Sequence, residues 1–124
     1  MTVGQINTFD FDGVIYLGEK ILGLTPQRND IIITGRTFEE KEIVERILLH
    51  RGIFNQVYYN PTPKCIRTRE QSGQHKGLVL MHLINEKGVK HGVHFEDDEI
   101  QIAEILKIIP TLTIVHIKHE LTVK

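Results

Sequence analysis

Two aspartates, Asp10 and Asp12, stand one residue apart directly after an apolar run, and Gly13 follows them. Successive side chains of a strand point to opposite faces, so both carboxylates point the same way for as long as the extended geometry lasts. Like charges this close repel each other unless one keeps its proton or a cation lies between them. Carboxylate oxygens are ligands that Mg²⁺ accepts, together with water and substrate phosphate. The pair therefore predicts a magnesium site at the carboxyl end of a strand, where open α/β sheets hold their ligands. The plain alternative is a strand end with two solvated aspartates before a glycine turn.

Three further polar groups stand at or beside the ends of predicted elements. Thr34, Gly35 and Arg36 follow the apolar run 31–33, Lys76 opens a predicted helix, and Asp97 and Asp98 follow the run 93–95. Each has a structural explanation of its own: a helix cap, a solvated surface charge, and an acidic pair that favours the N-terminal end of a helix dipole. Their joint order with the first pair favours a phosphate-handling site.

Hydrolysis of a phosphate monoester needs a nucleophile and a proton donor. Asp10 can attack phosphorus to form an aspartyl-phosphate, which divides one difficult step into two. Asp12 can protonate the leaving oxygen and later activate water, and its backbone carbonyl is a candidate metal ligand.

The phosphoryl oxygens need positive charge and hydrogen-bond donors. Thr34 offers a hydroxyl, and the N–H groups from Gly35 onward are expected at a helix N-terminus, which favours an anion. Lys76 supplies a fixed cation for the phosphoryl oxygens and for the nucleophile. Asp97, together with Asp98, would complete the Mg²⁺ site, and lysine and metal together give the electrostatic stabilisation that this slow reaction requires.

Strands and helices are expected to alternate along the chain, which indicates an α/β fold with a parallel sheet covered on both faces. The expected strands are Gln5–Phe9, Ile31–Ile33, Gln56–Tyr59, Val93–Phe95 and Leu112–Ile117. Helices are expected from a capping box at Thr37 and Glu40 to Gly52, from His75 to Gly88, and over Ile100–Ile108. A short hairpin arm is expected at 14–17, and Asn60–Gln74 is expected to be an irregular loop.

The composition is that of one globular domain. The chain has 124 residues, 40% of them hydrophobic and 25% charged, with a formal net charge of −1. Such a charge exerts no global attraction on nucleic acid or membrane. Cys65 is the only cysteine, which excludes an intrachain disulfide and suits a reducing compartment. Because the N-terminus carries no secretory or membrane-spanning pattern, a soluble cytoplasmic protein is expected.

The order Asp-x-Asp, Thr-Gly-Arg, Lys, Asp-Asp resembles motifs I to IV of the haloacid dehalogenase (HAD) superfamily of phosphatases, over residues 6–98. The resemblance implies a single domain, residues 1–124, with a three-layer Rossmann-like parallel sheet of strand order 5-4-1-2-3. It makes Asp10 similar to the nucleophile and Asp12 to the acid/base. Thr34 and Lys76 match the phosphate binders, and Asp97 and Asp98 the acidic motif that holds Mg²⁺. Residues 13–24 would form a small flap, and no interval leaves room for the cap domain of many relatives.

A site without a cap domain favours a large substrate that itself covers the site, such as a nucleic-acid end or a protein. The alternative is an oligomer in which a neighbouring subunit covers the site. The candidate substrate-binding cations are Arg36, Lys64, Arg67 and Arg69, which could follow a phosphate backbone. The motif order and the ending Phe95–Asp98 look most like the polynucleotide-end phosphatase and RNA-repair branch. Two alternatives stay open: a small-metabolite phosphatase (sugar phosphate or nucleotide) closed by oligomerisation, and a catalytically silent binding module.

Two other groups of reactive side chains are weaker candidates. His91 and His94 have metal-like spacing, but a strand entry between them would place their rings on opposite faces. Cys65 could be reactive beside its cations, although an incidental loop thiol explains it as well.

Overall fold

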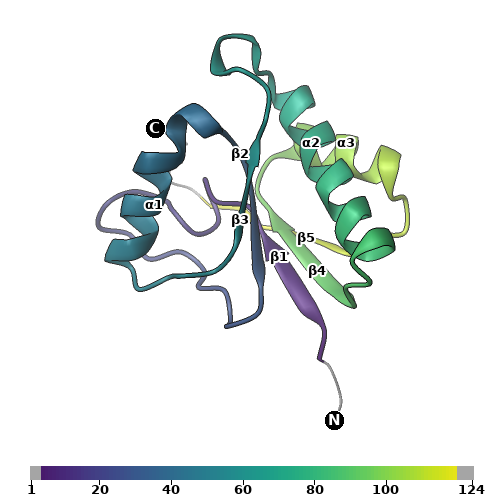
Figure 1. Cartoon of the computed structure of the whole chain (residues 1–124), viewed down its shortest axis with the longest axis horizontal. Helices are drawn as coiled ribbons and strands as arrows, with labels where there is room; N and C mark the ends of the chain where they lie inside the picture. The colour runs from purple at the N-terminus through teal and green to yellow at the C-terminus, as the bar shows by residue number, and fades with distance from the viewer. Residues whose placement is uncertain (1–3, 120–124) are drawn as a thin grey trace.

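A computed structural model describes residues 4–119 and shows one five-stranded, all-parallel sheet between two layers of helices (Figure 1). The strands are β1 (Ile6–Phe9), β2 (Ile31–Thr37), β3 (Val57–Asn60), β4 (His91–Glu96) and β5 (Ile114–His116). They lie side by side in the order β3-β2-β1-β4-β5. Counted from the β5 edge, this is the order 5-4-1-2-3.

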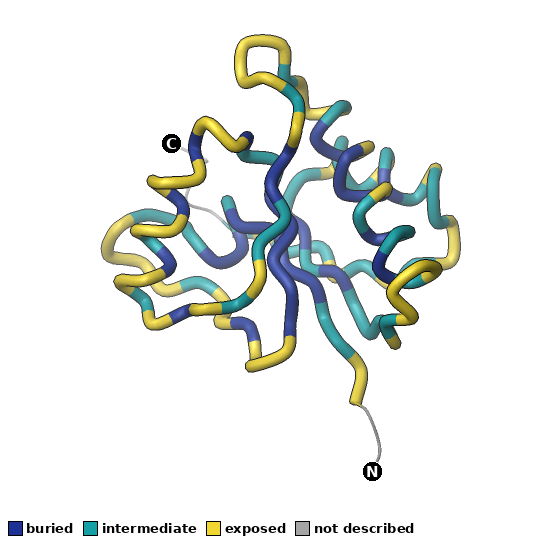
Figure 2. Tube along the Cα trace, in the orientation of Figure 1, coloured by how far each residue is buried: buried dark blue, intermediate teal, exposed yellow. Residues whose placement is uncertain are grey.

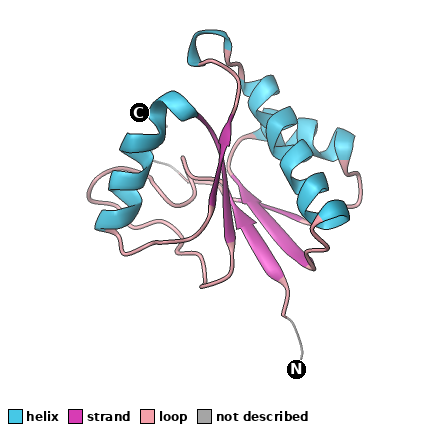
Figure 3. Ribbon diagram, in the orientation of Figure 1, coloured by secondary structure: helices cyan, strands magenta, loops and turns pink. Residues whose placement is uncertain are grey.

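The helices divide between the two faces of the sheet. They are η1 (Phe38–Glu40), α1 (Lys41–His50), η2 (Lys64–Ile66), α2 (Arg69–Met81), the π turn η3 (His82–Glu86) and α3 (Glu99–Ile108). Helix α1 covers one face, and α2 and α3 cover the other (Figures 1 and 3). Of the helices in residues 4–119, none is long and apolar enough to cross a membrane.

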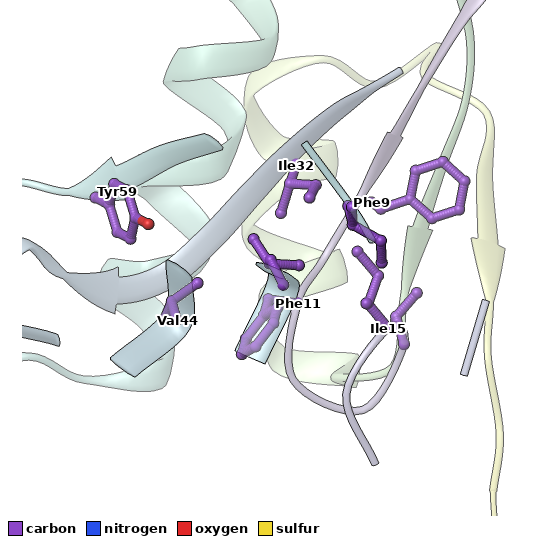
Figure 4. Packing of buried hydrophobic residues seen from close by; sticks show 9 residues of the cluster. Phe9, Phe11, Ile15, Ile32, Val44 and Tyr59 are labelled. Atoms are coloured by element: carbon purple, nitrogen blue, oxygen red, sulfur yellow. The ribbon is translucent and has the colours of Figure 1, made fainter. Parts of the chain in front are cut away.

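The apolar runs of the central strands fill two cores, one on each face. Ile32 packs toward α1 with Phe9, Phe11 and Val44, whereas Ile31 and Ile33 belong to the cluster beneath α2 and α3. This alternation confirms that the run 31–33 is a strand buried on both faces. Figure 2 shows the buried positions concentrated along the central strands, and Figure 4 shows the packing of the first cluster.

Two residues of the segment after β1 pack into the α1-side core. Val14 and Ile15 are each 1% exposed. The expected hairpin arm is reduced to isolated bridges of Tyr16 with Asp12 and with Leu22. The antiparallel bridge between Tyr16 and Leu22 lies within residues 13–24, where the resemblance implies a small flap, and residues 16–18 line the cavity at the strand ends.

Helix α2 begins at Arg69, six residues before the predicted start at His75. The prediction that residues 60–74 form one irregular loop was therefore wrong. The hydroxyl of Thr68 accepts a hydrogen bond from the Gln71 N–H (3.0 Å) and caps the helix. Thr68-x-x-Gln71 has the form of a capping box, a signal present in the sequence. Lys76 consequently lies in the middle of α2 and not at its start.

Two glycines let α2 approach α3 closely. A Cβ atom at Gly73 would lie 2.8 Å from Cα of Gln101, and one at Gly77 would lie 2.7 Å from Cδ1 of Ile108. The contact with Gln101 is to backbone, which cannot rotate away. This seam of Gly73 and Gly77 therefore fixes how α2 lies against α3.

Candidate active site

A cavity of about 890 Å³ lies where β1, β2 and β4 end. Charged residues of both signs line it: Asp10, Asp12, Arg36, Glu40, Lys64, Arg67, Arg69, Lys76, Asp97 and Asp98. The motifs that are far apart in the chain thus meet at one edge of the sheet, as the strand-end argument predicts.

The deepest part of the site is an ion triad of Asp10, Lys76 and Glu96. The ammonium of Lys76 donates to Oδ1 of Asp10 (2.7 Å) and to Oε1 of Glu96 (2.9 Å). The exposed fractions of these residues are 4%, 1% and 0%, respectively. Oδ1 of Asp10 also accepts the N–H of Phe11 (2.8 Å). Removing Lys76 would leave two buried carboxylates without their shared counter-charge.

The strand geometry explains how these side chains meet. Phe9 stacks on Phe95 on the α1 side, with ring centroids 4.7 Å apart. Their neighbours Asp10 and Glu96 point to the opposite face because strand side chains alternate. There they meet Lys76, which α2 directs toward the sheet.

The electrostatics of the triad reflect two carboxylates that share one ammonium. Burial, reinforced by the negative charge of Glu96, raises the pKa of Asp10 well above its usual value. Burial alone would lower the pKa of Lys76, but the charges of Asp10 and Glu96 outweigh it and raise that pKa. Lys76 therefore stays an ammonium, and the site has an excess of negative charge that a further cation would relieve.

Asp97 adds a third carboxylate beside Asp10 and Glu96. One oxygen of each of the three lies within 4.8 Å of the others. Burial, then the charge of Asp10, raises the pKa of Asp97 to about 6. Nε2 of His119 lies 3.3 Å from Oδ2 of Asp97. Gly13, with φ +80°, is required here because a Cβ atom would overlap the Asp97 carboxylate.

The donor chemistry of this group fits a hard divalent cation. The three ligating atoms are all carboxylate oxygens, the type that Mg²⁺ prefers. Oε2 of Glu96 is buried and has no hydrogen-bond partner among the described residues. Three crowded carboxylates with one lysine leave an excess of negative charge that a metal ion would offset.

Asp98 lies outside this carboxylate group. Its Oδ1 caps α3 by accepting the N–H groups of Ile100 (2.9 Å) and Gln101 (3.3 Å). Arg69 donates to both of its oxygens, each at 2.9 Å. A carboxylate held by a helix end and a guanidinium is already satisfied, so Asp97 and not Asp98 is the candidate ligand.

Asp12 is not part of this carboxylate group, although it lines the same cavity as Asp10. The strand ends at Phe9, so the extended geometry on which the expected common direction of Asp10 and Asp12 depends stops before them. Arg36 binds Asp12 in a bidentate pair, with Nε to Oδ2 at 2.9 Å and Nη2 to Oδ1 at 2.8 Å. Arg36 therefore contacts the expected acid/base directly.

Thr34 lies deeper than the motif suggested. Strand β2 continues to Thr37, so Thr34 is inside the strand, fully buried, and no helix begins directly after it. Its hydroxyl accepts the N–H of Arg36 at 3.0 Å. Gly35 and Arg36 line the cavity, whereas Thr34 is not among its lining residues. Thr37 is the N-cap of η1, as predicted, and its N–H donates to Oε1 of Glu40 (3.1 Å). The N–H groups of Gly35 and Arg36 therefore belong to β2 and not to a helix N-terminus.

The basic residues of the segment 64–69 do reach the cavity. Lys64, Arg67 and Arg69 all line it. Arg67 donates to Oε1 of Glu40 (2.9 Å), and Arg69 is paired with Asp98. The two arginines thus carry counter-charges in the structure, and a substrate anion would compete with those carboxylates.

Sequence reasoning missed Glu96 and His119. Glu96 was placed after the strand, although β4 runs through it. Its signal was the period of two from His94, a second polar residue on the same strand face. His119 follows the last strand, where a polar residue has no distinguishing pattern. The prediction that His91 and His94 face opposite ways was wrong, because a register shift between Ile6 and Thr8 turns both rings toward one side.

The site combines Asp10 bound to the Lys76 ammonium, a group of three carboxylates suited to a divalent cation, and a cavity lined by acidic and basic side chains. No family model, curated protein or solved structure matches the chain.

The two adjacent aspartates give a direct test of the metal site. Mg²⁺ is expected to raise the melting temperature of the wild type and of Asp98→Asn, but hardly that of Asp97→Asn. Asparagine at 98 can still cap α3 and lies outside the carboxylate group, so it is a matched control. Without metal, Asp97→Asn should melt higher than wild type at neutral pH, because a raised pKa means that folding disfavours the ionised carboxylate. An equal Mg²⁺ shift in all three proteins contradicts this assignment.

Proposed function

We propose that the protein is a Mg²⁺-dependent phosphomonoester hydrolase of the HAD type that acts through an aspartyl-phosphate. The observation that carries the proposal is the buried pair of Asp10 and Lys76, 2.7 Å apart, at the floor of an open cavity beside Asp97. The strand order and the meeting of the motifs at the carboxyl edge support a HAD-like fold without a cap domain.

Asp10 is the nucleophile in this proposal. Its Oδ1 is held by Lys76 and by the N–H of Phe11, so Oδ2 is the oxygen left to attack phosphorus. The attack forms an oxygen–phosphorus bond while the bond to the leaving oxygen breaks. Lys76 stays charged and stabilises the negative phosphoryl oxygens without moving, because α2 and Glu96 hold it.

Asp12 serves the leaving group and the water that later hydrolyses the aspartyl-phosphate. In the structure both of its oxygens are bound by Arg36, but the Asp12 side chain is 49% exposed. Pairs with this exposure are weak, so a phosphate dianion can draw Arg36 to itself and free Asp12. Arg36 then binds the phosphate while protonated Asp12 gives its proton to the leaving oxygen. As a carboxylate, Asp12 next takes a proton from the water that attacks phosphorus and breaks the bond to Asp10.

Asp10 and Asp97 would hold the metal ion, with Glu96 behind them. When bound, Mg²⁺ supplies positive charge to the transferring phosphoryl group and orients it.

The decisive experiment is hydrolysis of p-nitrophenyl phosphate by the purified chain. We expect turnover with Mg²⁺, loss of turnover with EDTA, recovery on adding Mg²⁺ and little recovery with Ca²⁺, whose larger and looser shell would misplace the attacking oxygen. A chain that binds Mg²⁺ but hydrolyses none of a panel of sugar phosphates, nucleotides and 3′- and 5′-phosphorylated oligonucleotides would be the catalytically silent binding module.

For the substrate, we propose a polynucleotide 3′ end. Lys64, Arg67 and Arg69 line the same open cavity as Asp10, where the phosphates preceding the end could lie. The second candidate, a small sugar phosphate or nucleotide in an oligomer, needs none of these contacts.

The variant Arg67→Ala, Arg69→Ala separates the two substrate classes. We expect its kcat/KM to fall on a 3′-phosphorylated oligonucleotide and to hold on p-nitrophenyl phosphate. Each lost phosphate contact should also flatten the slope of log K against log[salt] by about 0.7–0.9. Arg46→Ala, Lys107→Ala is the matched control, because those side chains are 63% and 70% exposed and do not line the cavity. Equal values on both substrates, with an unchanged salt slope, favour the small-metabolite phosphatase.

A further inference from the structure

A line of buried polar side chains runs behind the ion triad, between β1 and β4. Nε2 of His94 lies 3.1 Å from Oε1 of Glu96, the oxygen that also accepts from Lys76. Nδ1 of His94 lies 2.8 Å from Oγ1 of Thr8, and Nε2 of His91 lies 2.9 Å from the same hydroxyl oxygen. Thr8, His94 and Glu96 are all 0% exposed.

The direction of each hydrogen bond follows from the partners. Glu96 is a carboxylate beside an ammonium and can only accept, so His94 must donate to it from Nε2–H. His94 is fully buried, where a second ring proton would add a charge with no carboxylate beside Nδ1 to balance it, so Nδ1 is an acceptor. The Thr8 hydroxyl therefore donates to Nδ1 of His94. Its oxygen accepts from His91, whose burial lowers its pKa to about 4 and keeps that ring neutral as well.

Each group in this line thus donates to the next one nearer the site: His91 to Thr8, Thr8 to His94, and His94 to Glu96. One oxygen of Glu96 receives both the His94 donor and the Lys76 ammonium, which fixes the carboxylate where Lys76 can still reach Asp10. The opposite tautomer of His94 would put a lone pair against Glu96 at the same separation and repel it. The Glu96 carboxylate therefore selects the Nε2–H tautomer, and the Thr8 hydroxyl stabilises it by donating to the ring nitrogen on the far side.

We propose that His94 is a positioning residue for phosphoryl transfer: held by Thr8 as the Nε2–H tautomer, it orients Glu96 and thereby sets Lys76 against the nucleophile Asp10. The inference rests on the proposed function for its kinetic consequences. The tautomer and the position of Lys76 can be measured without turnover. Loss of an outer-shell residue that orients a metal ligand typically lowers activity by about 10–100-fold. We expect an effect of the same size when His94 no longer orients Glu96.

Two substitutions at Thr8 and one at His94 test the proposal. Thr8→Val has nearly the same shape but lacks the hydroxyl, and Thr8→Ser keeps it. His94→Leu removes the donor to Glu96. We expect Thr8→Val and His94→Leu to lower kcat by about 10–100-fold with little change in KM, and Thr8→Ser to stay near wild type. A merely structural role would not separate kcat from KM or distinguish serine from valine in proteins shown to be equally folded.

Nitrogen chemical shifts in ¹⁵N-labelled protein provide the measurement that needs no activity. Wild type and Thr8→Ser should show His94 protonated at Nε2 alone, and Thr8→Val should shift the His94 Nδ1 signal, because that nitrogen loses its hydrogen-bond donor. The Lys76 ammonium signal should shift in Thr8→Val and His94→Leu. Wild-type His94 protonated at Nδ1, or an unshifted Lys76 signal in both variants, overturns the proposal. If wild type hydrolyses no phosphate ester, the proposed function fails, and these shifts still decide whether His94 positions Lys76.

Discussion

Replacement of Asp10 by asparagine is expected to reduce phosphate-ester turnover to the uncatalysed background while the protein remains folded. An amide oxygen cannot form the aspartyl-phosphate, and Glu96, the other carboxylate that Lys76 holds, is not among the lining residues of the cavity. Asparagine has almost the shape of aspartate, and its neutral side chain relieves the repulsion with Glu96 and Asp97. The melting temperature should therefore be unchanged or higher.

The measurement is turnover of p-nitrophenyl phosphate with Mg²⁺, on protein shown by mass spectrometry not to have deamidated. Asp30→Asn is the control, because Asp30 is buried but accepts hydrogen bonds from the N–H groups of Asn7 (3.0 Å) and Gln27 (2.8 Å), away from the cavity. It is expected to keep the wild-type rate per folded molecule. Wild-type turnover by Asp10→Asn would remove Asp10 from the mechanism.

Replacement of Lys76 by methionine should give the largest loss of stability in the molecule. The side chain is 1% exposed and is the shared counter-charge of Asp10 and Glu96. Breaking a buried ion pair by removing one partner costs about 3–5 kcal/mol, because the charge left behind is uncompensated. The loss should be greatest at neutral pH and shrink in acid, since the already raised pKa of Asp10 lets that carboxylate take up a proton as the pH falls.

Urea unfolding at pH 7 and pH 5 measures this effect. Lys107→Met is the matched control, as that side chain is 70% exposed and should change the free energy of unfolding little. Adding Asp10→Asn and Glu96→Gln to Lys76→Met should recover most of the loss, because the triad is then neutral throughout. A change of less than about 1 kcal/mol in the single variant would mean that the triad is better solvated than its burial indicates.

The strands of the sheet were accessible from the sequence because each carries a short apolar run bounded by polar residues. Ile31, Ile32 and Ile33 need both faces of a sheet for burial, and only a central strand provides them. The same reasoning located Asp10 and Asp97, since strand ends of a parallel sheet share one edge. The order of the motifs identified Lys76 as a site residue. Its position in the middle of α2 was not predicted, because the start of that helix depends on the Thr68 cap, and the residues around it also fit an irregular loop.

The remaining differences come from contacts between residues far apart in the chain. Asp98 is paired with Arg69, 29 residues away, and Asp12 is paired with Arg36, so both lie outside the group of Asp10, Glu96 and Asp97. Glu96 became part of the site because α2 places an ammonium under β4. Local patterns specify which face a side chain takes, but they contain no information about which charge will reach it from another element.

The seam of Gly73 and Gly77 makes the site vulnerable to changes that touch no substrate. Gly73 is three residues before Lys76, and Gln101, its neighbour across the seam, lies in the first turn of the helix that follows Asp97. A single methyl group at 73 would have to push backbone aside, and the two helices would carry Lys76 and Asp97 apart. The distance between α2 and α3 therefore restricts which residues can occupy positions 73 and 77. Alanine is ordinarily the mildest substitution in a helix, but at position 73 it is expected to move Lys76 and Asp97 relative to each other.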